Sequence, residues 1–183
     1  YQFFTMPGLY QVLNGINLFA PKFNVIPPGV DEELYFPYHE KQRRIEAKTQ
    51  HWENRLFQER SDDIFGELED PDKPPIFTMA RFDKIKNITG LIEAFGQSKK
   101  LQTHYNLVFA AGTVHIDESQ DAEEREEIAR AYQLIENYDL GGHVRWLPSI
   151  NKLETGEVYR VIADRGGVFV QPALFEAFGM TIL

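Results

Sequence analysis

Short apolar runs alternate with segments of helical periodicity from about residue 74 onward. Strands that are buried on both faces of a sheet carry continuous rather than alternating apolar residues, and these runs mostly have that character. The order strand, helix, strand is typical of β-α-β units, and it predicts an α/β fold with a parallel sheet and flanking helices. The predicted strands are residues 76–81, 106–111, 144–147 and 167–171.

Helical spacing of apolar residues predicts three helices between these strands. The first begins after Asn87, which suits the N-cap position, and the other two cover about residues 121–139 and 155–163. The second helix opens with the acidic run 121–127, whose charge favours a helix N-terminus. Because such runs usually keep a helix surface hydrated, we interpret this one as a solvated face.

The chain before residue 74 is less regular. A polar stretch from about residue 40 to residue 65 predicts one or two helices, and residues 61–75 have the composition of a linker. The apolar side chains expected to make contacts in this stretch are Ile45, Trp52, Leu56 and Phe57. We therefore divide the chain into an interdomain segment (1–30), a polar helical segment with its linker (31–72) and a sheet domain (73–183).

Composition and charge narrow the class of protein. Hydrophobic residues make up 43% and charged residues 26% of the 183 positions, as in ordinary globular proteins. The net charge of −9 disfavours binding to nucleic acid or to an anionic membrane, because both require a basic face. No apolar run reaches the roughly 18 residues of a membrane-spanning helix, and the first residues do not resemble a signal peptide. We therefore expect a cytoplasmic protein.

Several kinds of chemistry are disfavoured by missing residues and motifs. The chain has no Cys, which excludes disulfides and thiolate chemistry, and its five His residues lack the spacing of a metal site. We therefore expect no metal. The nucleophile elbow, the phosphate loop and the dinucleotide-binding fingerprint are also missing, so nucleophilic hydrolysis and dinucleotide binding lose support.

The first candidate site lies in the sequence ARFDKIKNITG. Ligands of open parallel α/β sheets bind where strands end and loops lead into helix N-termini. Arg81 ends the first predicted strand, and Lys86 follows five residues later, just before the expected helix. Both cations can face one crevice, where Arg offers a planar fork to phosphate oxygens and Lys offers a point charge. From spacing alone, a diphosphate site and a pair of ordinary surface cations both stay open.

The second candidate site follows the last predicted strand, in the sequence QPALFEAFGMTIL. A helix is expected to open at Met180 and Thr181 after Gly179, and free N–H groups at such an opening bind phosphate or sugar oxygens. Glu176 lies in the loop between strand and helix and can accept hydrogen bonds from sugar hydroxyls. A solvated loop carboxylate is the alternative, since the chain has 28 acidic residues.

The blocks IFTMARFDKIKNITGLIEAFG and FVQPALFEAFGMTIL resemble sucrose synthases, which are retaining glycosyltransferases of GT-B fold. The resemblance extends through PGLYQVLNGIN, FNVIPPGVDEELYFPY and WLPSINKLETGEVYR, and it leaves out the polar stretch between about residues 40 and 72. It implies that the sheet belongs to the Rossmann-like C-terminal domain of a GT-B enzyme. It also implies that the chain covers the nucleotide-binding half of such an enzyme and is truncated before that half is complete.

The resemblance also implies roles for particular residues. In that family the Arg and Lys of the A-R-x-D-x-x-K-N block hold the diphosphate of the sugar nucleotide, and Arg81 and Lys86 occupy these positions. Glu176 matches the first of two Glu residues, which lies near the transferred hexose, whereas the second would follow Leu183. Catalytic roles are thus implied for Arg81, Lys86 and Glu176. The family's contacts to glucose and phosphate match Phe178, Gly179, Met180 and Thr181.

The loop that meets the nucleotide base departs from the plant pattern. Plant-type sucrose synthases contact uracil through a Gln and an Asn in the loop after W-I-S-S, whereas the loop here reads WLPSINKLETGE and is one residue shorter. Ser149 or Ile150 then takes the first position and Thr155 the second. The choice between ADP and UDP stays open, and we expect a bacterial-type enzyme that tolerates or prefers ADP.

The implied activity is reversible transfer of glucose between sucrose and a nucleoside diphosphate, ADP or UDP, with retention at the anomeric carbon. Its products are fructose and the NDP-glucose. The implied partners are a nucleotide sugar and sucrose or fructose, in a homo-oligomer without a cofactor. The acceptor site would belong to an N-terminal domain, so we expect these 183 residues alone to be inactive.

Two other functions remain open. Sucrose-phosphate synthase shares the cation block, the IPPG turn and the Glu motif. A non-catalytic nucleotide-binding or assembly module could also keep the fold without turnover.

Overall fold

Four parallel strands form a sheet in residues 33–176, the part of the chain that the computed structural model describes. The spatial order is β3-β2-β1-β4. The strands are β1 (Pro75–Met79), β2 (Asn106–Ala110), β3 (Val144–Leu147) and β4 (Val168–Phe169). All four predicted strands are therefore confirmed. β4 is shorter than the apolar run 167–171, because within residues 33–176 only Val168 and Phe169 pair with β1.

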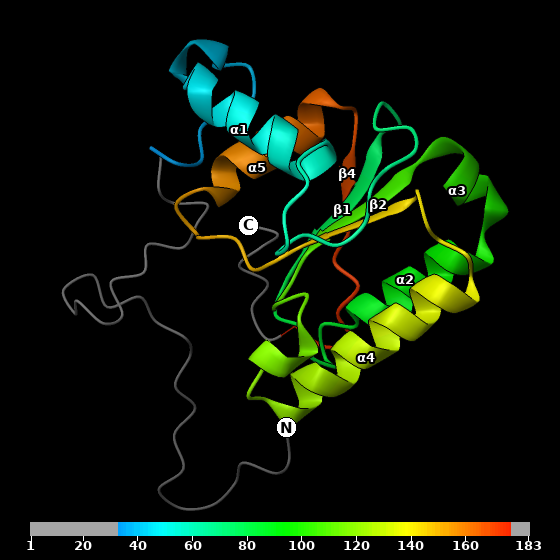
Figure 1. The fold of residues 1–183 in the computed structure, drawn as a ribbon. Helices are drawn as coiled ribbons and strands as arrows, with labels where there is room; N and C mark the ends of the chain where they lie inside the picture. The colour runs from blue at the N-terminus through cyan, green and yellow to red at the C-terminus, as the bar shows by residue number, and fades with distance from the viewer. Residues whose placement is uncertain (1–32, 177–183) are drawn as a thin grey trace, which may run out of the picture.

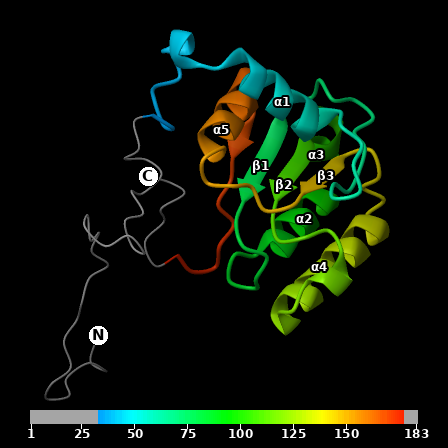
Figure 2. The same cartoon turned by 60° about the vertical axis from the view of Figure 1, so that its left-hand side comes forward.

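Helices cover both faces of this sheet (Figure 1). The helices α2 (Ile88–Gln97) and α4 (Ala122–Asn137) lie on one face, and α1 (Glu46–Phe57) and α5 (Thr155–Asp164) lie on the other (Figures 1 and 2). The three predicted helices, α2, α4 and α5, are confirmed with bounds within two residues. The sequence did not predict α3 (Lys99–His104), a short polar helix that Ser98 caps by accepting a hydrogen bond from the Leu101 N–H. Residues 33–176 also contain the short 3-10 helices η3 (Lys41–Arg43) and η4 (Ile116–Glu118).

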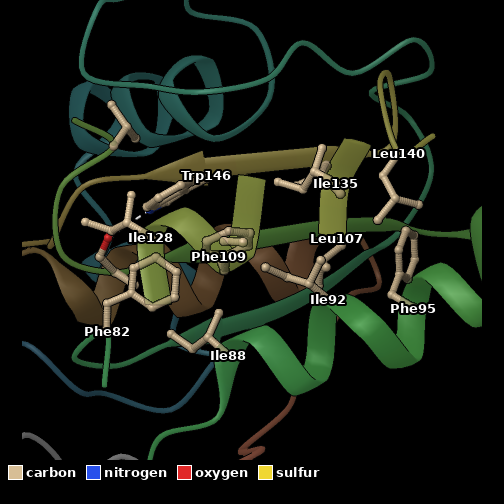
Figure 3. Packing of buried hydrophobic residues seen from close by; sticks show 14 of the residues in the cluster. Phe82, Ile88, Ile92, Phe95, Leu107, Phe109, Ile128, Ile135, Leu140 and Trp146 are labelled. Carbon is tan, nitrogen blue, oxygen red and sulfur yellow. Dashed lines mark hydrogen bonds between the residues drawn. The ribbon is translucent and has the colours of Figure 1, made fainter. Parts of the chain in front are cut away.

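Side chains of the central strands point alternately into two separate hydrophobic cores, one on each face of the sheet. Both faces are therefore buried, which explains why these strands are apolar at successive positions. Leu107 and Phe109 of β2 pack against α2 and α4, whereas Val108 and Ala110 pack against α1 and α5. Figure 3 shows the first core, in which Trp146 also lies and donates a hydrogen bond from Nε1 to the Ala111 carbonyl at 2.8 Å. The buried residues that α2 and α4 contribute to it are Ile88, Ile92, Phe95, Ile128, Ala131 and Ile135.

The second core contains most of the contacts expected in the polar stretch. Trp52, Leu56 and Phe57 of α1 are buried there, as predicted. The prediction for Ile45 is wrong, because its side chain is 58% exposed. Ile45 has extended backbone at the N-cap position of α1 and so lies outside the helical repeat that directs the other three side chains inward.

The segment after α1 lies along β3. Phe65 bridges to Trp146 and Leu68 bridges to Gly142. Arg145 of β3 is buried beneath this segment, and its guanidinium donates to the carbonyls of Arg55, Glu59 and Gly66. Burial lowers the pKa of Arg145. These hydrogen bonds fix residues 59–68 against the sheet.

The acidic run at the start of α4 is only partly solvated. Glu127 is 2% exposed, and its carboxylate accepts a hydrogen bond of 2.6 Å from the Thr89 hydroxyl of α2. Glu126 pairs with the Lys84 ammonium at 2.6 Å, and Glu123 accepts from the Lys84 N–H at 3.0 Å. The prediction of a solvated face therefore fails at Glu127, because α2 packs directly on this side of α4.

Candidate functional site

The strand order creates a topological switch point between β1 and β4. From β1 the chain moves to β2 and then β3 on one side, and it returns to pair β4 on the other side of β1. In open α/β sheets, ligands bind in the crevice beyond the carboxyl ends of strands at such a point. The residues that follow these two strands, 80–87 and 170–176, are the two segments that carry the sequence candidates.

Hydrogen bonds join the two segments. The Leu174 N–H donates to the Ile85 carbonyl at 2.8 Å, and the Asn87 side-chain amide donates to the Pro172 carbonyl at 3.1 Å. In Figures 1 and 2 the red segment after β4 runs past the loop that leads into α2. The switch point is therefore bordered by two loops that are tied together by backbone and side-chain contacts.

Lys86 and Glu176 meet where these loops join. Lys86 Nζ lies 2.5 Å from Glu176 Oε2, and the exposed fractions of the two side chains are only 17% and 26%. Gln171 Nε2 lies 3.5 Å from the same carboxylate oxygen. The fold thus brings together one predicted phosphate-binding cation and the predicted sugar-binding carboxylate.

Arg81 lies on the same loop but reaches toward solvent. Its side chain is 81% exposed and pairs with Asp83 at 3.1 Å. The other oxygen of the Asp83 carboxylate accepts a hydrogen bond of 2.9 Å from the Lys86 N–H. Asp83 thus links the Arg81 guanidinium to the backbone of Lys86, and the sequence analysis assigned it no role.

An open cavity of about 340 Å³ lies beside Arg81. It is lined by Arg81, Phe82, Asp83, Ile85, Gly112, Asp121, Glu123, Glu124 and Ser149. The Ser149 N–H donates to the Gly112 carbonyl at 2.9 Å, which holds the loop after β3 against the loop after β2. Arg81 and Ser149 therefore line one cavity, although they follow different strands.

The other residues predicted to meet the base lie elsewhere. Ile150 packs against the core beneath α1 and α5. Thr155 is buried at the start of α5, where its hydroxyl donates to the Lys152 carbonyl at 2.8 Å and contacts the Tyr35 hydroxyl. Ser149 lines the cavity, whereas Ile150 and Thr155 do not. The predicted contacts Phe178, Gly179, Met180 and Thr181 lie outside the described residues.

Asn87 occupies the predicted N-cap position but does not act as a side-chain cap. Its backbone is left-handed, with φ 55° and ψ 36°, and its side chain makes no capping hydrogen bond to α2. The amide is instead directed to Pro172. The sequence carries one sign of this arrangement, which is Gly90 in the first turn of the helix. A Cβ at position 90 would lie 2.3 Å from Asn87 Oδ1 and so would displace the Asn87 side chain.

Comparison with family models shows the protein family of this chain. The family model described as glycosyl transferases group 1 matches residues 59–183. The chain belongs to this family. A second model, described as the first GT-B domain of sucrose synthase, matches residues 1–57, which include α1. The chain thus combines segments that match two different family models.

Curated relatives confirm the resemblance stated above. A sucrose synthase from Thermosynechococcus vestitus is 56% identical over 100% of this chain and 23% of its own length. A sucrose synthase from Nitrosomonas europaea is 49% identical with the same coverages, and sucrose synthase 2 from Arabidopsis thaliana is 49% identical over 98% of this chain and 23% of its own. The chain therefore spans about a quarter of the length of these relatives.

A solved structure supports the fold. A sucrose-phosphate synthase from Thermosynechococcus elongatus superposes with a TM-score of 0.51 at 19% identity, over 81% of this chain and 29% of that one. This likeness shows the fold alone, and with the group 1 family match it confirms the expected GT-B class of α/β domain.

Residues 33–176 contain neither a membrane-spanning helix nor a cluster of metal-binding side chains. No helix there has the length and apolar character to cross a membrane. No group of three or more His, Asp and Glu side chains in that range is arranged to hold a metal ion.

Proposed function

We propose that these residues are the nucleotide-sugar-binding part of a cytoplasmic sucrose synthase. The reaction is the reversible transfer of glucose between sucrose and ADP or UDP, with retention at the anomeric carbon. The observation that carries this proposal is the contact between Lys86 and Glu176 at the switch point of the sheet. It joins a phosphate-binding type of side chain with a sugar-binding type in the place where this class of sheet binds ligands.

Charge supports a diphosphate as the group that Lys86 and Arg81 bind. A pair of unit charges about 4 Å apart near a protein surface is worth about 4 kcal/mol before desolvation is subtracted. Lys86 is already largely removed from water, so a phosphate that reaches it adds little further desolvation of the ammonium. Arg81 is exposed and can close onto the second phosphate as a planar fork.

The proposed chemistry is stabilisation of charge on the departing diphosphate. Lys86 and Arg81 act as preorganised cations, which lower the energy of a transition state in which negative charge grows on the phosphate oxygens. Glu176 accepts hydrogen bonds from hydroxyls of the transferred glucose. Backbone groups at Phe178, Gly179, Met180 and Thr181 complete the site in this proposal.

The cavity beside Arg81 is the place we propose for the nucleoside. Ser149 borders it and offers a hydroxyl to the base, whereas Ile150 and Thr155 would need to turn outward to reach a ligand. A small hydroxyl side chain discriminates weakly between bases, so we propose that ADP and UDP are both accepted, with ADP equal or preferred.

In the same proposal, the whole protein binds the nucleotide and the fructose in two different domains. The sheet domain begins near residue 73, and the acceptor site for fructose lies in a domain outside these residues. The whole protein would be a homo-oligomer that needs no cofactor and binds neither nucleic acid nor membrane.

Calorimetric titration with ADP and with UDP tests this proposal. The wild-type chain should bind ADP weakly, and Lys86→Ala should weaken that binding at least tenfold. Lys84→Ala is the matched control, because Lys84 lies on the same loop but pairs with Glu126 on α4. Equal affinity of Lys86→Ala and wild type, with both folded by circular dichroism, would exclude the phosphate role.

Sucrose-phosphate synthase is the alternative within this class, and the solved structure noted above bears that name. Identities of 49 to 56% to sucrose synthases, against 19% to that structure, favour the first assignment. Turnover of fructose by the full-length protein, compared with fructose 6-phosphate, separates the two activities.

A further inference from the structure

Asn87 has a left-handed backbone, and its side chain contacts Pro172 instead of capping α2. An Asn at an N-cap normally has extended backbone and accepts a hydrogen bond from an N–H in the first helical turn. Asn87 is left-handed and makes no such bond. Residues other than Gly adopt this conformation at a cost, and Asn is among the few that tolerate it. The cost is offset by the hydrogen bond from its amide to the Pro172 carbonyl.

Gly90 leaves the space that this amide needs. A Cβ at position 90 would lie 2.3 Å from Asn87 Oδ1 and 2.7 Å from both Cγ and Nδ2. A methyl group there cannot coexist with the present position of the Asn87 side chain. Gly in a helix interior costs about 0.5 to 1 kcal/mol relative to Ala, so helix propensity does not explain a Gly at this position.

The hydrogen bond from Asn87 acts at the junction of the two loops. Asn87 is adjacent to Lys86, and Pro172 lies four residues before Glu176. Leu174 lies between Pro172 and Glu176, and its N–H donates to the carbonyl of Ile85, the residue before Lys86. The contacts Asn87 to Pro172, Leu174 to Ile85 and Lys86 to Glu176 therefore lie side by side along the same two segments.

We propose that Asn87 is a positioning residue for the Lys86 and Glu176 pair, and that Gly90 is required so that the Asn87 amide can reach Pro172. In its role toward nucleotide this inference rests on the proposed function. The tie between the loops is a property of the chain itself and can be measured without any ligand.

The experiment is a double-mutant cycle. Asn87→Gly keeps the left-handed backbone but removes the amide, and Gly90→Ala displaces the amide without changing any residue of the loop. In the Asn87→Gly background the added methyl no longer meets a side chain at position 87. The effect of Gly90→Ala should then disappear, which a general disturbance of α2 would not produce.

Amide hydrogen exchange measured by NMR is the readout that needs no ligand. Exchange at Leu174 should accelerate about fivefold to tenfold in each single variant, as expected for the loss of one ordinary hydrogen bond. The Phe109 amide in the centre of β2 reports global unfolding, and exchange at Leu174 is compared with it. Unchanged relative exchange at Leu174, or equal effects of Gly90→Ala in both backgrounds, overturns the positioning role.

Titration with ADP is the second readout. Each single variant should weaken ADP binding about fivefold to tenfold with little change in its melting temperature, whereas the double variant should be no weaker than Asn87→Gly alone. If wild type binds no ADP, the proposed function fails and exchange at Leu174 alone decides the positioning role. If wild type binds ADP and the single variants bind it equally well, Asn87 does not position the site.

Discussion

Lys86 Nζ lies 2.5 Å from Glu176 Oε2, although Lys86 follows the central strand β1 and Glu176 follows the edge strand β4. The two residues meet because β4 pairs with β1 on the side opposite β2, so the loops that follow β1 and β4 are neighbours. The proposed ligand carries both phosphate and hydroxyl groups, which a cation and a carboxylate paired beside such a crevice can bind.

Lys86→Ala in the full-length protein should lower kcat/KM for sucrose cleavage by about two to three powers of ten. That factor corresponds to about 2 to 4 kcal/mol of transition-state stabilisation by one preorganised cation. Steady-state kinetics with ADP and sucrose measure it, and Lys84→Ala should stay within about threefold of wild type. A rate for Lys86→Ala equal to that of wild type would remove Lys86 from the mechanism.

Glu176→Gln should tighten the binding of inorganic pyrophosphate to the chain by a few-fold. The carboxylate competes with phosphate for Lys86 and repels an anion, so its neutral analogue leaves the ammonium available. Calorimetry at low and high salt measures the change, which should shrink as screening increases. Glu126→Gln is the control, because it releases Lys84 instead. Weaker pyrophosphate binding in Glu176→Gln would contradict the idea of competition.

Glu157→Gln should lower the free energy of unfolding by about 2 to 4 kcal/mol near neutral pH, since it leaves partners of a largely buried ion pair uncompensated. Glu157 of α5 accepts hydrogen bonds from Thr49, Arg44 and Arg160. Chemical denaturation of both proteins measures the difference. The exposed Glu136→Gln serves as the control and should change little.

The contribution of Glu157 should also depend on pH. Burial raises the pKa of this carboxyl, but the hydrogen bonds from Thr49, Arg44 and Arg160 outweigh burial, and its pKa lies below the ordinary 4.5. A lowered folded pKa means that the stabilisation is complete above the ordinary pKa and is lost as pH falls through the folded pKa. The wild type should therefore lose its advantage over Glu157→Gln below about pH 4.5. An advantage that persists at lower pH would show that charge on Glu157 is unimportant.

Gly66→Ala should destabilise the chain by about 2 to 4 kcal/mol, because it combines a strained backbone with a steric clash. Gly66 has φ +86°, and a Cβ there would lie 2.2 Å from the Val144 carbonyl oxygen of β3. Gly166→Ala is a matched control, since its φ is +66° but nothing lies within 4 Å of its Cβ, so it should cost about 1 to 2 kcal/mol. Equal melting temperatures of the two variants would show that the segment after α1 is not held against β3.

The 183 residues by themselves should not cleave sucrose in the presence of ADP or UDP. The proposed acceptor site belongs to a domain outside them, so the bound nucleotide would have no sugar donor in reach. A coupled assay for fructose measures this, with a full-length sucrose synthase as the positive control. Fructose release by the isolated chain would disprove the proposed division of labour.

The sequence by itself determined the elements that depend on local spacing. Continuous apolar runs predicted the four strands, because a strand covered on both faces of a sheet has no polar face, and helical periodicity predicted α2, α4 and α5, because burial of one helix face imposes a repeat of about 3.6 residues. The blocks around Arg81, Lys86 and Glu176 resemble sucrose synthases, and this resemblance indicated the glycosyltransferase class. These features are readable because each is contained within one short segment.

Only the tertiary structure decided which distant segments meet. The order β3-β2-β1-β4 sets the switch point, and it brings Lys86 to Glu176 and the Asn87 amide to Pro172. The burial of Glu127 against Thr89 has the same origin. These pairings depend on which strand lies beside which and on which helix covers it, and local periodicity carries no information about either.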